Sequence, residues 1–386
     1  MHLTILQGAF LPVPPLLGGA VEKMWFRLGQ EFAKRGHRVT HVSRQYPGLP
    51  DRDVINDVHH VRVPGYEQPA SLVKLKFLDL LYSYRACRLV PLDSDIVVTN
   101  TFWSPILLAR KLRGKIYADV ARMPRGQCRL YTGAGRLRAN STPVAEAMRR
   151  ELPISDQERI RIIPNPLPFD PPGVVDFSAK QKNILYSGRV HPEKGLDLLV
   201  KASSHLPPGW QVEIVGPWET AQGGGGRDYL VKLQSLANGL PVTFHGPEFA
   251  PDLLAEHYRR AAIFAYPSVA EKGETFGLSP LEAMAWGCVP VVSDLQCFKD
   301  FICHGVNGLV FQHRGKNAAS NLQTSLESLM ADPGLCERFS TQASGVGLTH
   351  SPSCVAEMFL EDFEQMRQGT TQAKPSMVGG LKTAGN

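Results

Sequence analysis

Four charged residues in the second half of the chain have the types and spacing to hold a ligand with both hydroxyl and phosphate groups. Glu274 and Glu282 lie in EKGETFGLSPLEAMAWGCVPVVSD, and Arg189 and Lys194 lie in SGRVHPEKG. Carboxylates accept hydrogen bonds from hydroxyl groups. The arginine fork and the compact lysine charge suit phosphate oxygens. Taken alone, Arg189 and Lys194 are better explained as solvated loop charges. Glu274 and Glu282, taken alone, are better explained as a loop charge and a helix-capping charge.

Both pairs are predicted to lie where a strand ends. Arg189 and Lys194 follow the apolar run NILYSGR and lead into the next helix. Glu274 lies in the loop VAEKGETFG, which follows the run AIFAYPS. Open α/β sheets bind their ligands outside the carboxyl ends of the strands. Position therefore makes phosphate binding by Arg189 and Lys194 as good an explanation as solvated loop charge, and it places Glu274 over the predicted cleft.

The helix after the second loop is predicted from SPLEAMAWG, with Ser279 as its N-cap and Pro280 at its first position. Glu282 would then lie about one turn into this helix. The free N–H groups at the helix start, together with Gly277, would form an anion site. Glu274 and Glu282 need not face each other, so each could hold a different part of an extended ligand.

The surrounding pattern predicts an α/β fold built from two Rossmann-like, doubly wound domains facing each other across a cleft. Short apolar runs alternate with helical patterns, which is typical of parallel sheets buried on both faces. Strands are predicted within residues 2–10, 37–44, 95–100, 115–120 and 136–141, and then within 183–189, 210–217, 242–247, 262–268, 289–294 and 308–311. The helix predicted over residues 20–36 ends at Gly36, a suitable C′ glycine.

A proline-rich segment over residues 162–177 predicts the linker between the two domains. We expect an N-terminal domain over residues 1–170, on the acceptor side, and a C-terminal domain over 178–350, on the donor side. A C-terminal helix over 351–368 could cross back to the first domain. Residues 369–386 are polar and glycine-rich, which predicts a disordered tail.

The charge is unevenly distributed along the chain. Residues 1–170 hold about 25 lysines and arginines against about 15 acidic residues, and the whole-chain totals are 42 and 36. The first part is therefore near +10 and the remainder near −4. A basic half suits nucleic acid, anionic lipid or a phosphorylated small molecule. The basic residues lack interleaved aromatics, so we predict no nucleic-acid partner.

The composition indicates a soluble, cytoplasmic protein with a sizeable core, because 43% of its 386 residues are hydrophobic and 20% are charged. No run reaches the ~18 apolar residues of a membrane helix, and MHLTILQGAF does not resemble a signal peptide. The seven cysteines form no CxxC pair. Neither a disulfide framework nor a zinc site is therefore expected.

Several stretches, in the right order, resemble the retaining GT-B glycosyltransferases of family four. PSVAEKGETFGLSPLEAMAWGCVPVVSD is similar to their signature of glutamate, seven residues and glutamate, followed by a run of the type AMAxGxPVV. LPVPPLLGGAVEKMWFRLGQEFAKRGHRVT resembles their N-terminal Gly-Gly loop and first helix. IIPNPL resembles the interdomain segment, and LYSGRVHPEKGLDLLV the phosphate site.

This resemblance implies a hexosyltransferase that uses a UDP- or GDP-sugar donor and no other cofactor. Glu274 would lie near the donor sugar hydroxyls, and Glu282 would accept hydrogen bonds from the ribose. Arg189 and Lys194 would neutralise the diphosphate, which is electrostatic stabilisation of the transition state. The other implied donor-binding residues are Gly18, Gly19, Gly188, Gly216, His245, Thr275, Phe276, Gly277 and Leu278, with the base also near Val215 and Gly246.

One position departs from the family. Many relatives place a histidine where KIYADVARMPRGQ has Asp119. Asp119 could bind a sugar hydroxyl in its place, or simply end the strand. Arg122, Arg125 and Gln127 follow on the acceptor side, where they could grip an anionic acceptor or form an ordinary solvated loop.

No metal is expected in the reaction. The motifs DRD, at Asp51 to Asp53, and DSD, at Asp93 to Asp95, match the Asp-x-Asp pattern of metal-dependent transferases but lie away from the predicted phosphate site. Lysine and arginine can supply the charge of magnesium instead. The glycine run at residues 223–226 lacks GxGxxG spacing and is predicted to be a mobile loop.

Three functions fit this set of residues. The first is transfer of a sugar to a sugar, a small molecule or a lipid-linked acceptor, with peripheral association at the inner face of the membrane as a further possibility. The second is a nucleotide-sugar epimerase of GT-B fold, which would need additional acid and base residues in the cleft. The third is a non-catalytic nucleotide-sugar-binding subunit, which would not need the complete set of charges.

Overall fold

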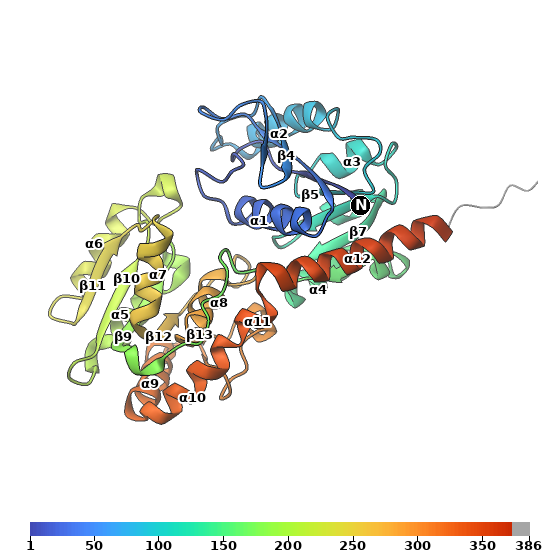
Figure 1. The fold of residues 1–386 in the computed structure, drawn as a ribbon. Coiled ribbons are helices and arrows are strands. Elements are labelled where there is room, and N and C mark those ends of the chain that lie inside the picture. Colours follow the sequence, from blue (N-terminus) through green and yellow to red (C-terminus); the bar gives the residue numbers. More distant parts are fainter. Residues whose placement is uncertain (373–386) are drawn as a thin grey trace, which may run out of the picture.

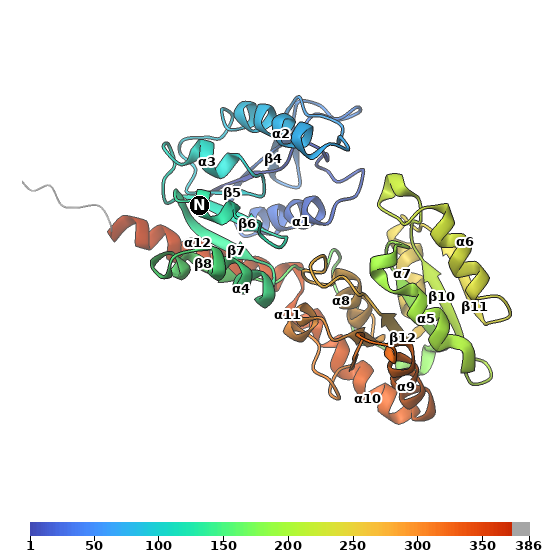
Figure 2. The same cartoon turned by 180° about the vertical axis from the view of Figure 1, so that it is seen from behind.

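The computed structural model describes residues 1–372, in which two mainly parallel β-sheets carry their helices on either side (Figure 1). The first sheet has the strand order β3-β4-β2-β1-β5-β6-β7-β8, and the second has the order β11-β10-β9-β12-β13-β14. Seen from behind, the two sheets remain separate bodies joined by crossing segments (Figure 2). The predicted fold class, two Rossmann-like α/β domains, is confirmed.

The first sheet contains the five predicted strands and three that the sequence analysis missed. The predicted strands are β1 His2–Leu6, β2 Arg38–Arg44, β5 Ile96–Thr99, β6 Ile116–Val120 and β7 Ala134–Ala139, and the added ones are β3 Arg52–Ile55, β4 Val58–Val63 and β8 Ile160–Ile162. β3 and β4 form an antiparallel hairpin. Its turn residues, Asn56 and Asp57, have positive φ angles of 47° and 63°. Asparagine and aspartate tolerate this conformation, which explains the tight two-residue turn.

The helices of this half are α1 Ala20–Lys34, α2 Leu72–Ala86, α3 Ser104–Leu108 and α4 Thr142–Glu151. α1 ends as predicted, because Gly36 has a φ of 78° and its N–H donates to the Ala33 carbonyl. The buried face of α1, which includes Trp25, Leu28 and Phe32, packs into one of the two cores of this sheet.

The second sheet consists of the six predicted strands. They are β9 Gln181–Ser187, β10 Gln211–Val215, β11 Val242–Gly246, β12 Ala261–Tyr266, β13 Val289–Ser293 and β14 Leu309–Phe311. All its recorded pairings are parallel. The chain order reverses between β9 and β12, which lie side by side. This reversal makes the carboxyl ends of β9 and β12 a topological switch point.

The helices of this half are α5 Leu196–Ala202, α6 Arg227–Leu236, α7 Pro251–Arg260, α8 Leu278–Ala285, α9 Ala318–Ala331, α10 Pro333–Ser344 and α11 Val346–Thr349. α8 corrects one prediction. Its N-cap is Gly277, with a φ of 93°, and Ser279 and Pro280 already lie inside the helix. Proline is tolerated there because the first-turn N–H groups have no partner within the helix.

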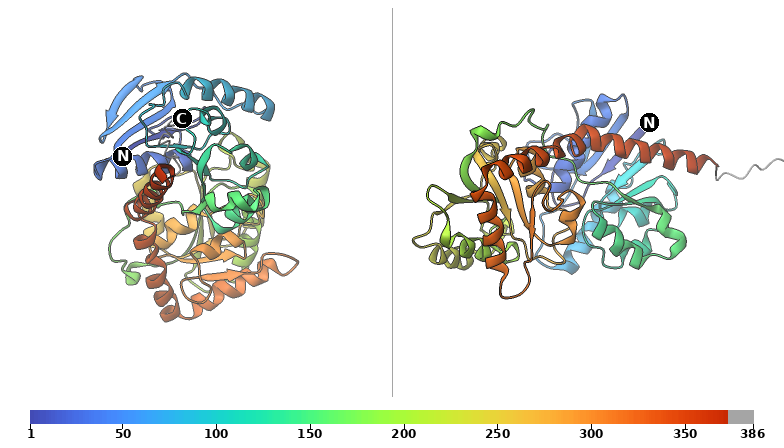
Figure 3. Two further views of the ribbon diagram at one scale, coloured as in Figure 1. Left: turned by 90° about the vertical axis from the view of Figure 1, so that its right-hand side faces the viewer. Right: turned by 90° about the horizontal axis from the view of Figure 1, so that it is seen from below.

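The final helix, α12 Pro352–Gln372, returns to the first sheet (Figure 3). It packs on α1, and the rings of Phe359 and Trp25 lie 4.9 Å apart. Tyr117 of β6 donates a 2.9 Å hydrogen bond to Asp362 of the helix. Helix α12 extends over residues 369–372, where a disordered tail was predicted to begin. The rest of that prediction, residues 373–386, lies outside the described residues.

Candidate active site

The predicted donor residues gather around the switch point of the second sheet. Lys194 closes the short 3₁₀ helix Pro192–Lys194 that follows β9, and Glu274 lies in the loop that follows β12. Because β9 and β12 are neighbours, these two loops emerge side by side. The SGRVHPEKG and GETFG motifs therefore lie at one edge of the second sheet.

Lys194, Glu274 and Tyr266 form a buried hydrogen-bonded group. The Lys194 Nζ atom donates to Glu274 Oε2 at 2.7 Å and to the Tyr266 hydroxyl at 2.9 Å. The Tyr266 hydroxyl donates to Glu274 at 3.2 Å. Burial, and then the Glu274 charge, raise the pKa of Tyr266 well above its usual value, so its hydroxyl stays protonated. The group places the Lys194 ammonium beside the Glu274 carboxylate, and both side chains are largely buried.

Tyr266 was not predicted as a site residue. It ends β12 in the run AIFAYPS, where an aromatic residue is also expected for a buried strand. Its place at the carboxyl end of a strand, directly before a loop with a candidate carboxylate, was the signal available in the sequence.

Arg189 does not join Lys194 in this structure. Its guanidinium donates to Glu193 at 2.6 Å and to the Gly223 carbonyl at 2.8 Å. The side chain is 43% exposed, so this ion pair is weak and can exchange for another anion. The glycine run also has a different role from the one predicted. Backbone hydrogen bonds join Gly225 to Val190 and Gly226 to Trp218, which ties the loop to the β9 and β10 ends.

Glu282 lies inside α8, apart from the Lys194 group. The Tyr258 hydroxyl of α7 donates to its carboxylate at 3.1 Å. Burial raises the pKa of Glu282 to about 7, although the Tyr258 hydrogen bond and the charge of Lys23 on α1 oppose the shift. The two glutamates therefore have separate surroundings, as the sequence spacing suggested.

Two glycines bring the ends of β9 and β10 into contact. Gly188 and Gly216 have φ angles of 149° and 148°, and a Cβ atom on Gly216 would lie 1.8 Å from the Gly188 carbonyl oxygen. The Gly216 N–H donates to the Gly246 carbonyl at 2.7 Å. Only glycine allows this approach, so both predicted glycines have a backbone role at the strand ends.

A cavity of about 200 Å³ lies beside these glycines, at the ends of β10 and β11. Its lining includes the predicted Gly216 and His245, and also two aromatic residues that were not predicted, Trp218 and Phe244. Aromatic rings offer flat apolar surfaces on which a base can stack. A larger hollow of about 490 Å³ lies near Met1 and α12 and contains none of the predicted residues.

The loop after β12 reaches the first half of the chain. The Thr275 hydroxyl donates to the Ala121 carbonyl at 3.2 Å, and Asn140 donates to Thr275 at 3.5 Å. Phe276 is buried, so its side chain belongs to the core, whereas its backbone enters the start of α8 with Gly277 and Leu278. The loop after β12 and the segments that follow β6 and β7 therefore meet at Thr275.

Asp119 is held by protein groups on both carboxylate oxygens. Arg138 donates to Oδ1 and Trp25 Nε1 donates to Oδ2, each at 2.8 Å. The side chains of Asp119 and Arg138 are fully buried. Both oxygens therefore already have partners within the protein. This favours a structural role for Asp119 at the end of its strand over binding of a sugar hydroxyl. Arg138 lies on β7, 19 positions from Asp119, so the sequence around Asp119 did not predict this ion pair.

The remaining N-terminal candidates lie in two exposed loops. Gly18 and Gly19 have φ angles of 80° and 92°, and Gly19 caps α1. Arg122 and Arg125 are exposed. The Gln127 side chain accepts a 2.6 Å hydrogen bond from the Arg125 N–H, so it shapes its own loop.

In each of the two Asp-x-Asp motifs, one aspartate forms an ion pair with an arginine. Asp93 pairs with Arg38 at 3.1 Å, and Asp53 pairs with the buried Arg62 at 2.8 Å. Within residues 1–372, one group has the composition and spacing to hold a metal ion: Glu213, His245 and His257. It lies among β10, β11 and α7, and it was not predicted. None of the helices in this range combines the length and hydropathy needed to cross a bilayer.

Two family models match consecutive parts of the chain. Glycosyltransferase Family 4 covers residues 18–170, and Glycosyl transferases group 1 covers residues 173–345. The second match contains both switch-point loops. The chain belongs to the group 1 glycosyl transferases. This assignment confirms the resemblance stated from the motifs.

This group 1 glycosyltransferase has curated relatives named D-inositol 3-phosphate glycosyltransferase. The relative from Rhodococcus erythropolis is 30% identical over 257 residues, covering 62% of this chain and 56% of the relative. The one from Mycobacteroides abscessus is 41% identical over 119 residues, or 30% of this chain and 25% of the relative. The chain spans about half the length of the curated relatives it matches first.

Solved structures share the fold across nearly the whole chain. Sucrose-phosphate synthase from Thermosynechococcus elongatus has a TM-score of 0.73 at 19% identity, covering 96% of this chain and all of that one. The Anabaena protein HepE, in complex with UDP and glucose, has a TM-score of 0.69 at 17% identity, covering 95% of this chain and all of that one. At these identities the likeness shows the fold alone.

Proposed function

We propose that this group 1 glycosyltransferase moves a sugar from a nucleoside-diphosphate sugar to an acceptor hydroxyl, with retention at the anomeric carbon. The observation that carries the proposal is the contact of Lys194 with Glu274 at the switch point. Lys194 supplies positive charge for the leaving diphosphate, and Glu274 accepts hydrogen bonds from hydroxyls of the transferred sugar. A donor therefore finds complementary groups for both of its ends within one loop pair.

In the proposed reaction, the acceptor oxygen forms a bond to the anomeric carbon on the face from which the diphosphate leaves. The bond between that carbon and the diphosphate oxygen breaks, and the leaving phosphate takes the acceptor proton. Lys194 and Arg189 stabilise the charge that develops on the diphosphate. The base stacks in the cavity beside Trp218 and Phe244, and Glu282 holds the ribose.

For the acceptor, we propose an anionic molecule bound near Arg122 and Arg125. Both side chains are exposed, and the loop that carries them follows β6, next to the Thr275 contact. The relatives named for D-inositol 3-phosphate suggest a phosphorylated polyol as one such acceptor. Arg125→Ala should raise the acceptor KM about tenfold, a typical effect of losing one charged contact. Arg149→Ala, on the exposed face of α4, is the matched control.

The proposed reaction is tested with a panel of UDP- and GDP-sugars. A bound donor raises the melting temperature by mass action, so thermal shift identifies the nucleotide and sugar. Turnover with that donor and an acceptor panel then gives a product whose anomeric configuration is read by NMR. An inverted product would contradict retention. Interconversion of the donor sugar without any transfer would favour the epimerase instead, and binding without turnover would favour the non-catalytic subunit.

A further inference from the structure

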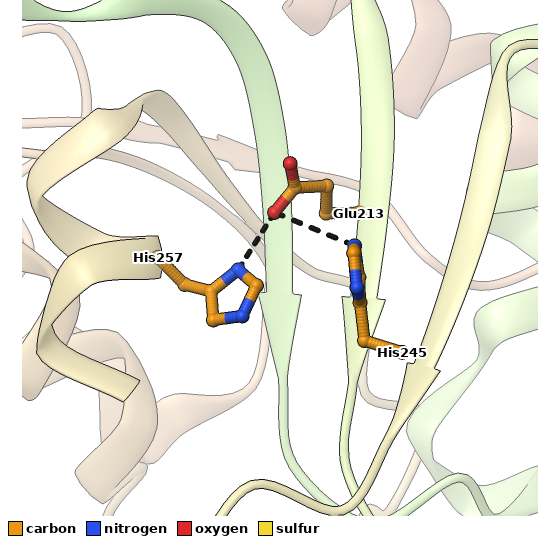
Figure 4. A group of neighbouring side chains, drawn as sticks. All are labelled: Glu213, His245 and His257. Carbon is orange, nitrogen blue, oxygen red and sulfur yellow. Dashed lines mark hydrogen bonds and ion pairs between the residues drawn. The ribbon is translucent and has the colours of Figure 1, made fainter. Parts of the chain in front are cut away.

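Glu213, His245 and His257 form a compact group away from the Lys194 contacts (Figure 4). We propose that this group binds one divalent transition metal, with zinc as the preferred ion. The group shares no residue with the Lys194 contacts or with the two Asp-x-Asp motifs, whereas His245 also lines the cavity proposed to hold the base. It would join β10, β11 and α7, three elements on the donor side.

The three ligand atoms are already close to the arrangement that zinc requires. Glu213 Oε2 lies 2.7 Å from His257 Nδ1 and 3.7 Å from His245 Nε2. One ligand atom from each residue lies within 4.8 Å of the other two. Zinc bonds of ~2.1 Å place tetrahedral ligand atoms roughly 3.4 Å apart. The observed separations of 2.7 and 3.7 Å lie on either side of that value.

The orientation of Glu213 follows from the alternation of β10. Val212 and Ile214 are buried in the apolar core, and Ile214 also lines the cavity described above. Successive side chains of a strand point to opposite faces, so Glu213 points toward the face that carries His257. Its side chain is only 7% exposed. A buried carboxylate needs a cation or several hydrogen bonds, and a metal meets that need.

The identity of the ion follows from the ligand types. Two imidazoles and one carboxylate suit zinc, whereas magnesium and calcium prefer oxygen ligands alone. Three protein ligands leave a fourth position for water. Because His245 also lines the cavity at the strand ends, the metal would fix one wall of that cavity.

A competing account is a metal-free network that uses Arg260. Its guanidinium lies 3.8 Å from the Glu213 carboxylate and 3.5 Å from His257 Nδ1. The Arg260 side chain is 36% exposed at the end of α7, so it can turn toward solvent when a metal enters. The two accounts make opposite predictions for an Arg260 variant. Arg260→Gln should keep or tighten metal binding if the site is built for an ion.

The test uses the full chain after removal of bound metals with a chelator. Titration with zinc against a chromophoric competitor should show one equivalent bound with a Kd of about micromolar or tighter. Cobalt should give the visible absorption of a tetrahedral site. Glu213→Gln and His257→Gln should each weaken binding at least tenfold. His205→Gln removes an exposed histidine outside the group and should leave both readouts unchanged.

Folding of each variant is checked by circular dichroism, and His245→Gln provides a third, independent ligand deletion. Zinc should also raise the melting temperature of the wild type, by mass action on the folded state, but not that of His257→Gln. Absence of saturable zinc binding, or equal affinity in the wild type and all three ligand variants, would overturn the proposal. Loss of zinc binding in Arg260→Gln would do the same.

Discussion

Lys194 and Glu274 are 80 positions apart in the chain, yet Lys194 Nζ and Glu274 Oε2 lie 2.7 Å apart. Their side chains are 9% and 10% exposed. The Tyr266 hydroxyl also donates to Glu274, so the carboxylate keeps a partner when Lys194 turns toward a phosphate. This contact links the two halves of the proposed donor site, the diphosphate side and the sugar side.

The first prediction concerns the diphosphate. Lys194→Ala and Arg189→Ala should each lower turnover about a hundredfold, because loss of one electrostatic contact to a transition state is worth ~3 kcal/mol. Steady-state kinetics with the identified donor measure the effect, and circular dichroism checks the fold. Lys201→Ala, on the exposed side of α5, is the control. Rates near the wild type in both variants would show that neither cation acts on the leaving group.

The second prediction separates the two glutamates. Glu282→Ala should weaken binding of the free nucleoside diphosphate ten- to a hundredfold, since a lost hydrogen bond to a charged group is worth ~1.5 to 3 kcal/mol. Glu274→Ala should leave that affinity nearly unchanged and lower turnover of the complete donor. Calorimetry measures both affinities. Equal losses in two folded variants, or none in either, would contradict the division between ribose and sugar.

The third prediction is a pH dependence of stability. Burial raises the pKa of Glu282 from 4.5 to about 7, so between these values the folded chain holds a proton that the unfolded chain has released. This contribution to stability is present below pH 4.5 and is lost as the pH rises through 7.

Glu282→Gln keeps a neutral side chain at every pH. Its melting temperature relative to the wild type should therefore be higher at pH 8 than at pH 5. Other titrating groups are the same in both proteins, so their effects on the melting temperature cancel when the wild type and Glu282→Gln are compared at one pH. Glu219→Gln, at an exposed position, should show no such trend. A constant difference between wild type and Glu282→Gln across this range would mean that Glu282 is ionised throughout.

The fourth prediction is that turnover does not require a metal ion. Activity should survive EDTA without added magnesium or manganese, because Lys194 and Arg189 supply the positive charge. Zinc removal from the Glu213 group is expected to lower the melting temperature, so rates are compared well below it. Complete loss of turnover on chelation, restored by magnesium or manganese, would reopen a catalytic role for Asp51 to Asp53 or Asp93 to Asp95.

The fifth prediction concerns an anionic membrane surface. Val73, Phe77 and Leu81 of α2 recur every four residues and are 81%, 58% and 39% exposed. Lys74 and Lys76 are exposed beside them. Apolar side chains among lysines suit the interface of an anionic bilayer. The protein should therefore bind vesicles that contain acidic lipids at low salt, and release them as salt rises, because charges are screened over ~8 Å at physiological salt.

The controls for this prediction separate the helix from general charge. Phe77→Asp should abolish vesicle sedimentation, whereas Val54→Asp, at a position that is also 58% exposed but lies on β3, should not. Neutral vesicles should bind weakly. Equal vesicle binding by both variants would mean that the net charge of the domain, and not α2, causes the binding. If the wild type did not bind acidic vesicles at low salt, the prediction of membrane association would be contradicted.

The sequence alone was enough to predict the fold, and it placed Arg189, Lys194 and Glu274 in the loops that follow two neighbouring strands. Apolar runs and their alternation with helical patterns predicted all six strands of the second sheet, because the central strands of a parallel sheet are buried on both faces and are mostly apolar. Arg189, Lys194 and Glu274 were predicted at strand ends from order along the chain. The three strands missed in the first sheet include β3 and β4, which form a half-exposed hairpin. Their polar residues interrupt the apolar run by which the other strands were predicted.

Only the tertiary structure decided which charges meet. Arg138 lies on the neighbouring strand to Asp119, and its guanidinium converts a candidate catalytic carboxylate into a buried structural one. Likewise, Glu213, His245 and His257 come from three elements and share no local motif, so no spacing along the chain predicts their contact. The physical reason is the same in both cases. Periodicity and turn residues act over a few neighbours along the chain, whereas side-chain pairing across a sheet depends on strand order and register.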